Sequence, residues 1–189
     1  MSIVNIKIFK AKTSYMKLFK EILLYVSSFI PLYFLVIVKE LVEIINGNLS
    51  FNITNGIMIC LNIIFIVLGV IGVVLVYKAS SYKTIEVISH QNVTRENFLP
   101  YFPLFVLFAL AFELEYISMA IVYLTILVLL GVVYVKNKMF YINPFLNIIG
   151  FSTYKITYKY NEKEKTKYVF SSSSIKKRNY KFNSFFVKK

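Results

Sequence analysis

Side chains that perform chemistry in proteins are scarce in this sequence. The chain has one histidine, His90, one cysteine, Cys60, nine glutamates and no aspartate. His90 lacks the cluster of cysteines, histidines or carboxylates that holds a metal. No nucleotide-binding loop and no serine–histidine–acid set is recognisable, so the means for acid–base or nucleophilic catalysis are thin. We therefore expect no metal, no cofactor and no enzymatic activity.

The elements that would position any site are four apolar segments without a charged residue. Hydrophobic residues make up 58% of the chain and charged residues 16%, whereas a soluble domain carries about 25% charged residues. The apolar residues come in blocks rather than at helical or strand period, which excludes a soluble globular protein. A bilayer core requires about 20 apolar residues of helix. The sequence predicts an all-α membrane bundle of four transmembrane helices within residues 22–135, at 22–38, 57–77, 98–112 and 116–135.

The third apolar segment is the shortest, and two interpretations of it stay open. Pro100 and Pro103 suit the first turn of a helix, where a missing N–H is tolerated. Glu113 and Glu115 then end the segment abruptly. We expect segments three and four to form a helical hairpin with an acidic tip on the outer face. The alternative is a re-entrant third segment.

The first two segments carry signals for shape and packing. Ser27, Ser28 and Pro31 form a combination that kinks membrane helices. Beyond them, helical spacing continues through a Lys39–Glu43 pair, which predicts a helix that ends at the turn dipeptide Asn46-Gly47. In the second segment, Gly69 and Gly72 are close enough together to let another helix approach, although they do not form a GxxxG motif.

Almost all basic residues lie in segments on one side of the predicted membrane helices. Of the 22 lysines and arginines, all except Lys39 lie before the first segment, between the second and third, or after the fourth. Because basic flanks resist translocation, that side is cytoplasmic. The Ile-, Asn- and Lys-rich composition suggests an AT-rich bacterial genome, so we expect a multi-pass inner-membrane protein with both termini cytoplasmic. This sorting and attraction to anionic lipids explain the net charge of +13, and direct binding of nucleic acid is not expected.

The cytoplasmic parts differ in character. Residues 1–21 form a basic N-terminal segment, whose first 17 residues suit either a helix along the inner face or a short strand. Residues 78–97 are interpreted as a connection. The basic tail, 136–189, predicts a small β element. Along its first strand one face carries Tyr154, Ile156, Tyr158 and Tyr160, and the other carries lysine and threonine. Residues 167–171 and 180–187 suit two further strands.

One stretch of the tail resembles a known family. Residues 143–154 read Asn-Pro-Phe-Leu-Asn-Ile-Ile-Gly-Phe-Ser-Thr-Tyr, and this pattern is similar to that of KwaA, the membrane subunit of the Kiwa anti-phage defence system, and its small four-span relatives. Phe151 departs mildly from the expected tyrosine. The resemblance implies an oligomer in the inner membrane that senses phage at the envelope and acts with a soluble cytoplasmic DNA-binding partner.

The resemblance also implies roles for particular residues. Asn143, Pro144, Gly150, Phe151 and Tyr154 are expected at a structural joint between the membrane bundle and the cytoplasmic strands. Pro144 fixes φ and Gly150 permits a sharp change of direction. The strand beyond, residues 154–160, is then a candidate docking strand that presents an open edge to the partner.

The leading hypothesis is a non-enzymatic sensor and scaffold in anti-phage defence, assembled as a homo-oligomer. Two alternatives from other classes remain. One is a membrane effector or pore, because a hydrophobically gated pore needs no charged residues. The other is a self-immunity protein against a bacteriocin.

Overall fold

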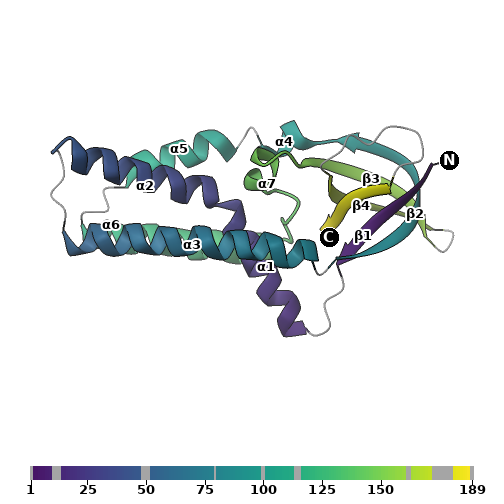
Figure 1. Cartoon of the computed structure of the whole chain (residues 1–189), viewed down its shortest axis with the longest axis horizontal. Coiled ribbons are helices and arrows are strands. Elements are labelled where there is room, and N and C mark those ends of the chain that lie inside the picture. Colours follow the sequence, from purple (N-terminus) through teal and green to yellow (C-terminus); the bar gives the residue numbers. More distant parts are fainter. Residues whose placement is uncertain are drawn as a thin grey trace.

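The protein consists of a helical bundle with a small β-barrel at one end (Figure 1). The computed structural model describes residues 2–9, 14–47, 52–78, 80–98, 101–112, 116–160, 163–171 and 181–187. The helices, in chain order, are α1 (Ser14–Ser28), α2 (Ile30–Ile45), α3 (Ile53–Lys78), α4 (Thr94–Phe98), α5 (Tyr101–Ala111), α6 (Ile117–Lys136) and α7 (Pro144–Ile148). The strands are β1 (Ser2–Phe9), β2 (Ser80–Asn92), β3 (Ser152–Tyr160), β4 (Lys163–Ser171) and β5 (Lys181–Val187).

The helices confirm a mostly helical protein with apolar membrane-spanning candidates. Among the described residues, two helices are long and apolar enough to cross a membrane, Ile53–Leu75 of α3 and Ile117–Lys136 of α6. The pair Leu18–Ser28 and Ile30–Ile45 is a third candidate if its two halves count as one span. The predicted four spans are not confirmed. The third apolar segment forms only α5, whose 11 residues rise about 16 Å, roughly half of the ~30 Å bilayer core.

The predicted kink in the first span is present. The axis bends by 45° between α1 and α2, at Phe29. Ser27 Oγ and Ser28 Oγ both donate to the carbonyl of Leu24, at 2.8 and 2.9 Å. Such back-bonding bends helices, and Pro31 in the first turn of α2 cannot donate its own backbone bond across the bend. The helix then ends at Asn46-Gly47, as predicted, with Gly47 at φ +72°.

The glycine pair in α3 is a contact site for α1. A Cβ built at Gly72 would lie 2.6 Å from Leu23 Cβ, and one at Gly69 would lie 2.9 Å from Ser27 Cα. Both distances are shorter than a van der Waals contact. The two helices therefore approach at a separation that only glycine permits here, which confirms the predicted packing face.

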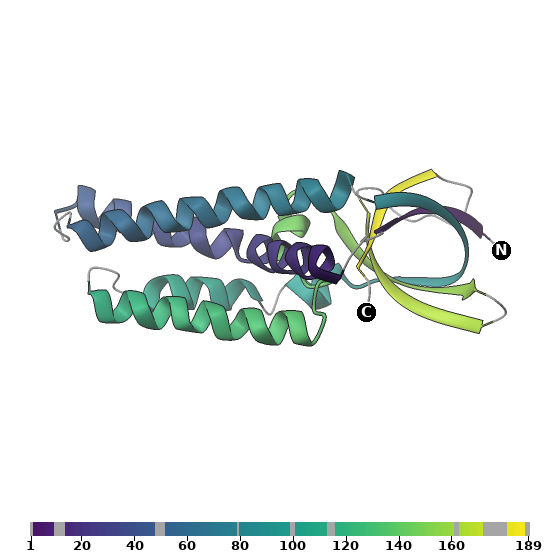
Figure 2. The same ribbon diagram turned by 90° about the horizontal axis from the view of Figure 1, so that it is seen from below.

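Helices α5 and α6 form a second layer beside α1, α2 and α3 (Figure 2). Apolar side chains fill the space between the layers, including Phe105 of α5, Phe112 directly after α5, and Tyr123 of α6. The Phe112 ring meets the Tyr123 ring edge-on at 5.4 Å between centroids. Lys39 Nζ donates to the carbonyl of Phe112 at 2.6 Å, so a side chain of α2 caps the C-terminal end of α5.

The β element is larger than the tail alone provides. Strands β3, β4 and β5 come from the tail, as predicted, but they close into a barrel in the order β1-β2-β3-β4-β5. The segment interpreted as a connection forms β2, whose eight-residue antiparallel ladder with β1 runs from Ser2–Val87 to Phe9–Ser80. The open question about residues 1–17 is resolved in favour of a strand over Ser2–Phe9. Parallel pairing of β1 with β5 closes the barrel.

Candidate functional site

The segment between α6 and β3 connects the helices to the barrel, and we call residues 137–151 the joint. Its centre is the short helix α7, which has a complete cap at each end. At the N-terminal end, Asn143 Oδ1 accepts a hydrogen bond from the backbone N–H of Leu146 at 3.1 Å. Pro144 follows in the first helical turn, where its fixed φ suits a helix start.

The C-terminal end of α7 is a Schellman motif. The N–H of Phe151 donates to the carbonyl of Leu146 at 2.9 Å, and the N–H of Gly150 donates to that of Asn147 at 3.1 Å. Gly150 has φ +93°, a conformation that side chains with a Cβ disfavour. The Phe151 side chain packs in the same apolar cluster as Leu146. The pattern that carries the family resemblance is therefore the capping pattern of one short helix.

Asn143 also fastens α7 to α1. Its Nδ2 donates to Ser27 Oγ at 2.8 Å and lies 3.4 Å from the carbonyl oxygen of Leu24. Asn143 and Ser27 are both fully buried. One amide thus caps α7 and bonds to the last turn of α1, at the bend of the broken span.

A second polar link joins the bend to the end of α6. Ser28 Oγ lies 2.8 Å from the hydroxyl oxygen of Tyr134, and that hydroxyl donates to the carbonyl of Ile142 at 2.9 Å. Burial in a low-dielectric site strengthens such bonds. The bend, the end of α6 and the start of the joint are therefore held together by one network.

The turn at the start of the joint, where α6 ends, has the same hydrogen-bond pattern as the C-terminal cap of α7, but without a glycine. Met139 N–H donates to the Tyr134 carbonyl at 3.0 Å and Lys138 N–H to the Val135 carbonyl at 3.1 Å. Lys138 occupies the left-handed position at φ 53°. This backbone conformation costs about 1–2 kcal/mol for a residue with a Cβ.

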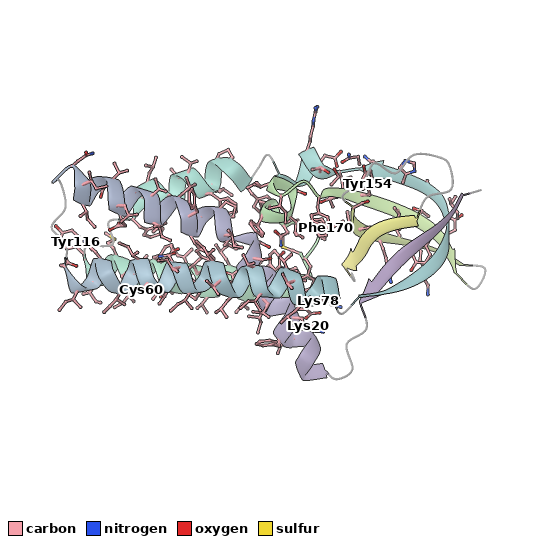
Figure 3. All side chains as sticks on the ribbon, viewed as in Figure 1. Lys20, Cys60, Lys78, Tyr116, Tyr154 and Phe170 are labelled. Carbon is pink, nitrogen blue, oxygen red and sulfur yellow. The ribbon has the colours of Figure 1, made fainter. Side chains whose placement is uncertain are left out.

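One apolar cluster continues from the bundle into the barrel. It contains Leu24 and Tyr25 of α1, Tyr134 of α6, Phe140 and Leu146 of the joint, and Phe170 of β4. Phe170 and Leu146 are fully buried. A barrel strand therefore packs directly against the joint and against α1 and α6, so that these parts share one core (Figure 3 labels Phe170 at this boundary).

Two further contacts hold the joint to the barrel. The ring of Tyr141 stacks on that of Tyr168 in β4, with centroids 4.1 Å apart and planes 12° apart. Burial, and secondarily the neighbouring Tyr168, raises the pKa of Tyr141 above its ordinary value, so the phenol stays protonated at neutral pH. Thr153 Oγ1 donates to Asn147 Oδ1 at 3.3 Å, and Thr153 N–H donates to Thr94 Oγ1 at 2.8 Å.

The predicted docking strand is β3, and the expectation of an open edge is wrong. β3 pairs with β2 along one edge and with β4 along the other. Tyr154, Ile156 and Tyr158 are buried, because this face of the strand turns into the closed barrel. Tyr160 pairs with Lys163 through the backbone, and its side chain lies outside the described residues, as do Glu113 and Glu115 of the predicted acidic tip.

The exposed face of the same strands is polar. Register places Gln91 beside Lys155 and Ser89 beside Thr157, and Thr157 in turn lies beside Thr166. Ser89, Gln91, Lys155 and Thr166 are exposed. We call these four residues the polar barrel face. Any macromolecule that binds the side of the barrel here would meet these side chains rather than the tyrosines.

Sequence reasoning placed Asn143, Pro144, Gly150 and Phe151 in one structural unit, and the structure brings them together, with Tyr154 nearby on β3. It missed the partners of that unit. Ser27 and Ser28 were recognised only as kink residues, and Tyr134 and Phe170 only as parts of apolar or alternating runs. A buried serine pair opposite a buried asparagine leaves no signal in sequence spacing, because the bonded residues are 116 positions apart.

Over the part of the chain that the structure describes, no three histidine, cysteine or acidic side chains come together in a way that could hold a metal ion. The contacts of the joint connect the helices mechanically to the barrel. A family model described as anti-phage protein KwaA matches residues 20–187, which takes in α2 to α7, most of α1, the joint and β2 to β5. No curated protein matches the chain, and no solved structure does.

Proposed function

The chain belongs to the KwaA family of anti-phage proteins, and from this premise we propose that it is the non-enzymatic membrane sensor and scaffold of a Kiwa-type defence system. In this proposal the helices detect infection at the bacterial inner membrane, as part of a homo-oligomer. The barrel recruits or activates a soluble cytoplasmic DNA-binding partner. The observation that carries the proposal is the continuous core from α1 and α6, through the joint, to Phe170 of the barrel.

The strand order of the barrel supports four membrane passes, although α5 alone is too short to cross a bilayer. β1 and β2 are neighbours in one barrel, and α1, α2 and α3 lie between them in the chain. β2 and β3 are also neighbours, and α5 and α6 lie between them. Strands of one barrel occupy one side of a membrane, so each helical excursion must return to its starting side. If α6 crosses, the segment containing α5 crosses too.

Side-chain placement supports the same orientation. Lys20 and Lys78 lie at the barrel end of the bundle, and Tyr116 lies at the opposite end (Figure 3). Lysines flank membrane helices on the cytoplasmic side, and tyrosines favour either interface. The barrel is therefore proposed to be cytoplasmic, with both the first and the last strand on that side and anionic lipids around the lysines.

Transmission from membrane to barrel is proposed to run through the joint. The bend of the broken span carries Ser27 and Ser28, and each is bonded to the joint or to its neighbour Tyr134. A change in the angle between α1 and α2 therefore displaces Asn143, and with it α7 and the barrel strands packed on α7. A packed, hydrogen-bonded contact of this kind has a small number of discrete arrangements, which a switch requires.

Because the barrel is closed, the docking surface is proposed to be the polar barrel face and not a strand edge. The test is a pull-down of the full-length protein, in mild detergent from infected cells of its host, with mass spectrometry of what is recovered. A variant with Lys155→Glu and Thr166→Glu is expected to lose a soluble DNA-binding partner that the unmodified protein recovers. Arg95→Glu with Lys78→Gln changes the charge equally at exposed positions outside the barrel and the joint and is expected to keep the partner.

Three results would count against the proposal. Equal recovery of the partner by both variants would exclude the polar barrel face as the docking surface. Loss of the partner in both variants would indicate a general effect of charge. Recovery of the protein alone, as a ring-sized homo-oligomer, together with dye leakage during infection, would favour the pore.

A further inference from the structure

A cavity of about 200 Å³ lies where the bend, α5, α6 and the joint meet. Phe105 of α5 and Leu130 and Val133 of α6 line its sides, and Phe29 of the bend and Met139 and Pro144 of the joint complete it. Val133 is 50% exposed, so the cavity reaches the surface of the bundle. Its position near the ends of α6 and α1 places it at the barrel end of the membrane segment.

The cavity is open to the surface of the bundle and large enough for an occupant. Its 200 Å³ corresponds to roughly seven waters at their liquid volume. The chemistry of the wall decides which occupant fits.

Water is a poor occupant because few polar groups in the wall can bind it. Tyr134 donates to the Ile142 carbonyl, and Ser28 Oγ lies within hydrogen-bond distance of the Leu24 carbonyl and of the Tyr134 hydroxyl. A buried water needs two to four polar partners. Tyr101 is the third polar side chain of the lining, and the other lining side chains are apolar.

The surface around the cavity is apolar. Val132 and Leu129, on the same part of α6, are 58% and 60% exposed, and Leu107 of α5 is 63% exposed. With α5 and α6 placed in the membrane as proposed above, this surface faces lipid. We propose that the cavity is a binding site for a segment of one phospholipid acyl chain from the leaflet on the barrel side.

Three walls of this site belong to the joint or to the bend. The acyl-chain segment would contact Met139, Pro144 and Phe29 directly. It would lie between the hydrogen-bond network of Ser28 and the first turn of α7. Occupancy of the cavity would then depend on the packing of that leaflet. The link from occupancy to signalling rests on the sensor function proposed above, whereas binding of the acyl chain rests only on the proposed placement of α5 and α6 in the membrane.

The test uses purified full-length protein in vesicles of phosphatidylethanolamine and phosphatidylglycerol. A trace of phosphatidylglycerol carries a photoactivatable diazirine in the middle of one chain, and adducts are mapped by mass spectrometry after illumination. We expect adducts on Met139 and Phe105, in addition to lipid-facing residues such as Ile71. Leu130→Phe, which fills the cavity, is expected to lose the Met139 adducts. Leu129→Phe adds the same ring on the lipid face and is expected to keep them.

Leu130→Ala, which enlarges the cavity, guards against a folding artefact and is expected to retain the Met139 adducts. Absence of Met139 adducts in the unmodified protein, while Ile71 is labelled, would overturn the proposal. Equal Met139 labelling in Leu130→Phe and Leu129→Phe would also overturn it. Phage protection is measured separately. If Leu130→Phe loses the adducts but protects cells as well as the unmodified protein, the acyl-chain site is supported and its link to signalling fails.

Discussion

The side chains of Asn143 and Ser27 form a hydrogen bond of 2.8 Å between positions 116 residues apart. Asn143 belongs to the helix that leads into the barrel, and Ser27 belongs to the last turn before the first membrane span bends. Both are fully buried. The contact joins the two elements whose relative movement a membrane sensor would use, and it can be tested by substitution.

Removing this bond is expected to destabilise the protein through two separable effects. Asn143→Ala loses the N-cap of α7, which is worth about 1 kcal/mol, and also the bond to α1. Ser27→Ala loses that bond and the bond from Ser27 Oγ to the Leu24 carbonyl, at about 1 kcal/mol each. The free energy of unfolding in detergent, measured for both variants and for the double variant, should show a coupling of about 0.5–1.5 kcal/mol. Strict additivity would mean that the bond contributes nothing.

The two left-handed residues of the joint are expected to respond oppositely to substitution. Gly150→Ala introduces a Cβ at φ +93° and should destabilise the protein by about 1 kcal/mol. Lys138→Gly relieves the same strain at φ 53° and should stabilise it by up to about 1 kcal/mol. No atom lies within 4 Å of a Cβ built at Gly150, so the effect comes from the backbone alone. Changes of the same sign in thermal unfolding would refute this explanation.

Close approach of α1 to α3 predicts that Gly72→Ala is poorly tolerated. Its Cβ would lie 2.6 Å from Leu23 Cβ and 2.9 Å from the Leu23 carbonyl oxygen, and neither atom is the end of a flexible side chain. Overpacking of this kind costs about 1–3 kcal/mol. Ile71→Ala, at an exposed neighbouring position of the same helix, is the matched control and should leave the unfolding temperature nearly unchanged.

Lys39 is the one basic residue that the sequence places away from the predicted cytoplasmic side. Because its side chain caps the C-terminal end of α5, substitutions at Lys39 and at its ion-pair partner Glu43 should differ in their effect on stability. Lys39→Met leaves the Phe112 carbonyl without the donor that now lies 2.6 Å away, which should cost about 1.5–3 kcal/mol for a charge-assisted bond. Glu43→Gln removes only the ion pair at 3.8 Å and should cost less than about 0.5 kcal/mol. A larger effect from Glu43→Gln than from Lys39→Met would show that the ion pair, not the cap, is what matters.

Cysteine labelling tests the four-pass topology. In a Cys60→Ser background, a membrane-impermeant maleimide added to intact spheroplasts should label Tyr116→Cys at the end of the bundle remote from the barrel. Ser89→Cys on the polar barrel face should be labelled only after the membrane is permeabilised. Labelling of both residues from outside would place the barrel on the outer side. Labelling of neither until permeabilisation would mean that α5 is re-entrant and α6 does not cross.

Local signals in the sequence predicted the local structure well. The serines with Pro31 predicted the bend, Asn46-Gly47 predicted the end of α2, and Gly69 and Gly72 predicted a helix contact. Alternation of Tyr154, Ile156 and Tyr158 predicted a strand with one buried face. Each of these features depends on neighbours within a few residues, so the sequence pattern contains the necessary information.

Features that depend on distant partners were missed. Strand β2 has few strongly apolar residues, and its ladder partners belong to β1 and β3, far away along the chain. Closure of the barrel therefore left no local pattern, and the open edge expected for β3 followed from counting only the tail strands. Glu40 follows the predicted first span, residues 22–38, yet it is 1% exposed inside the bundle, because α2 continues to Ile45.

Because β1 pairs with β5, the barrel can close only after the whole chain has been synthesised and its helices inserted. β1 precedes every helix in the chain and β5 follows every one, so their pairing requires that translation has passed all the membrane segments and that each has inserted in the correct direction. A chain with one inverted or stalled helix would have its strands on opposite sides of the bilayer and would leave unpaired strand edges, which quality-control proteases and chaperones recognise. In such a chain the barrel would not form, and neither would the surface proposed to recruit the effector.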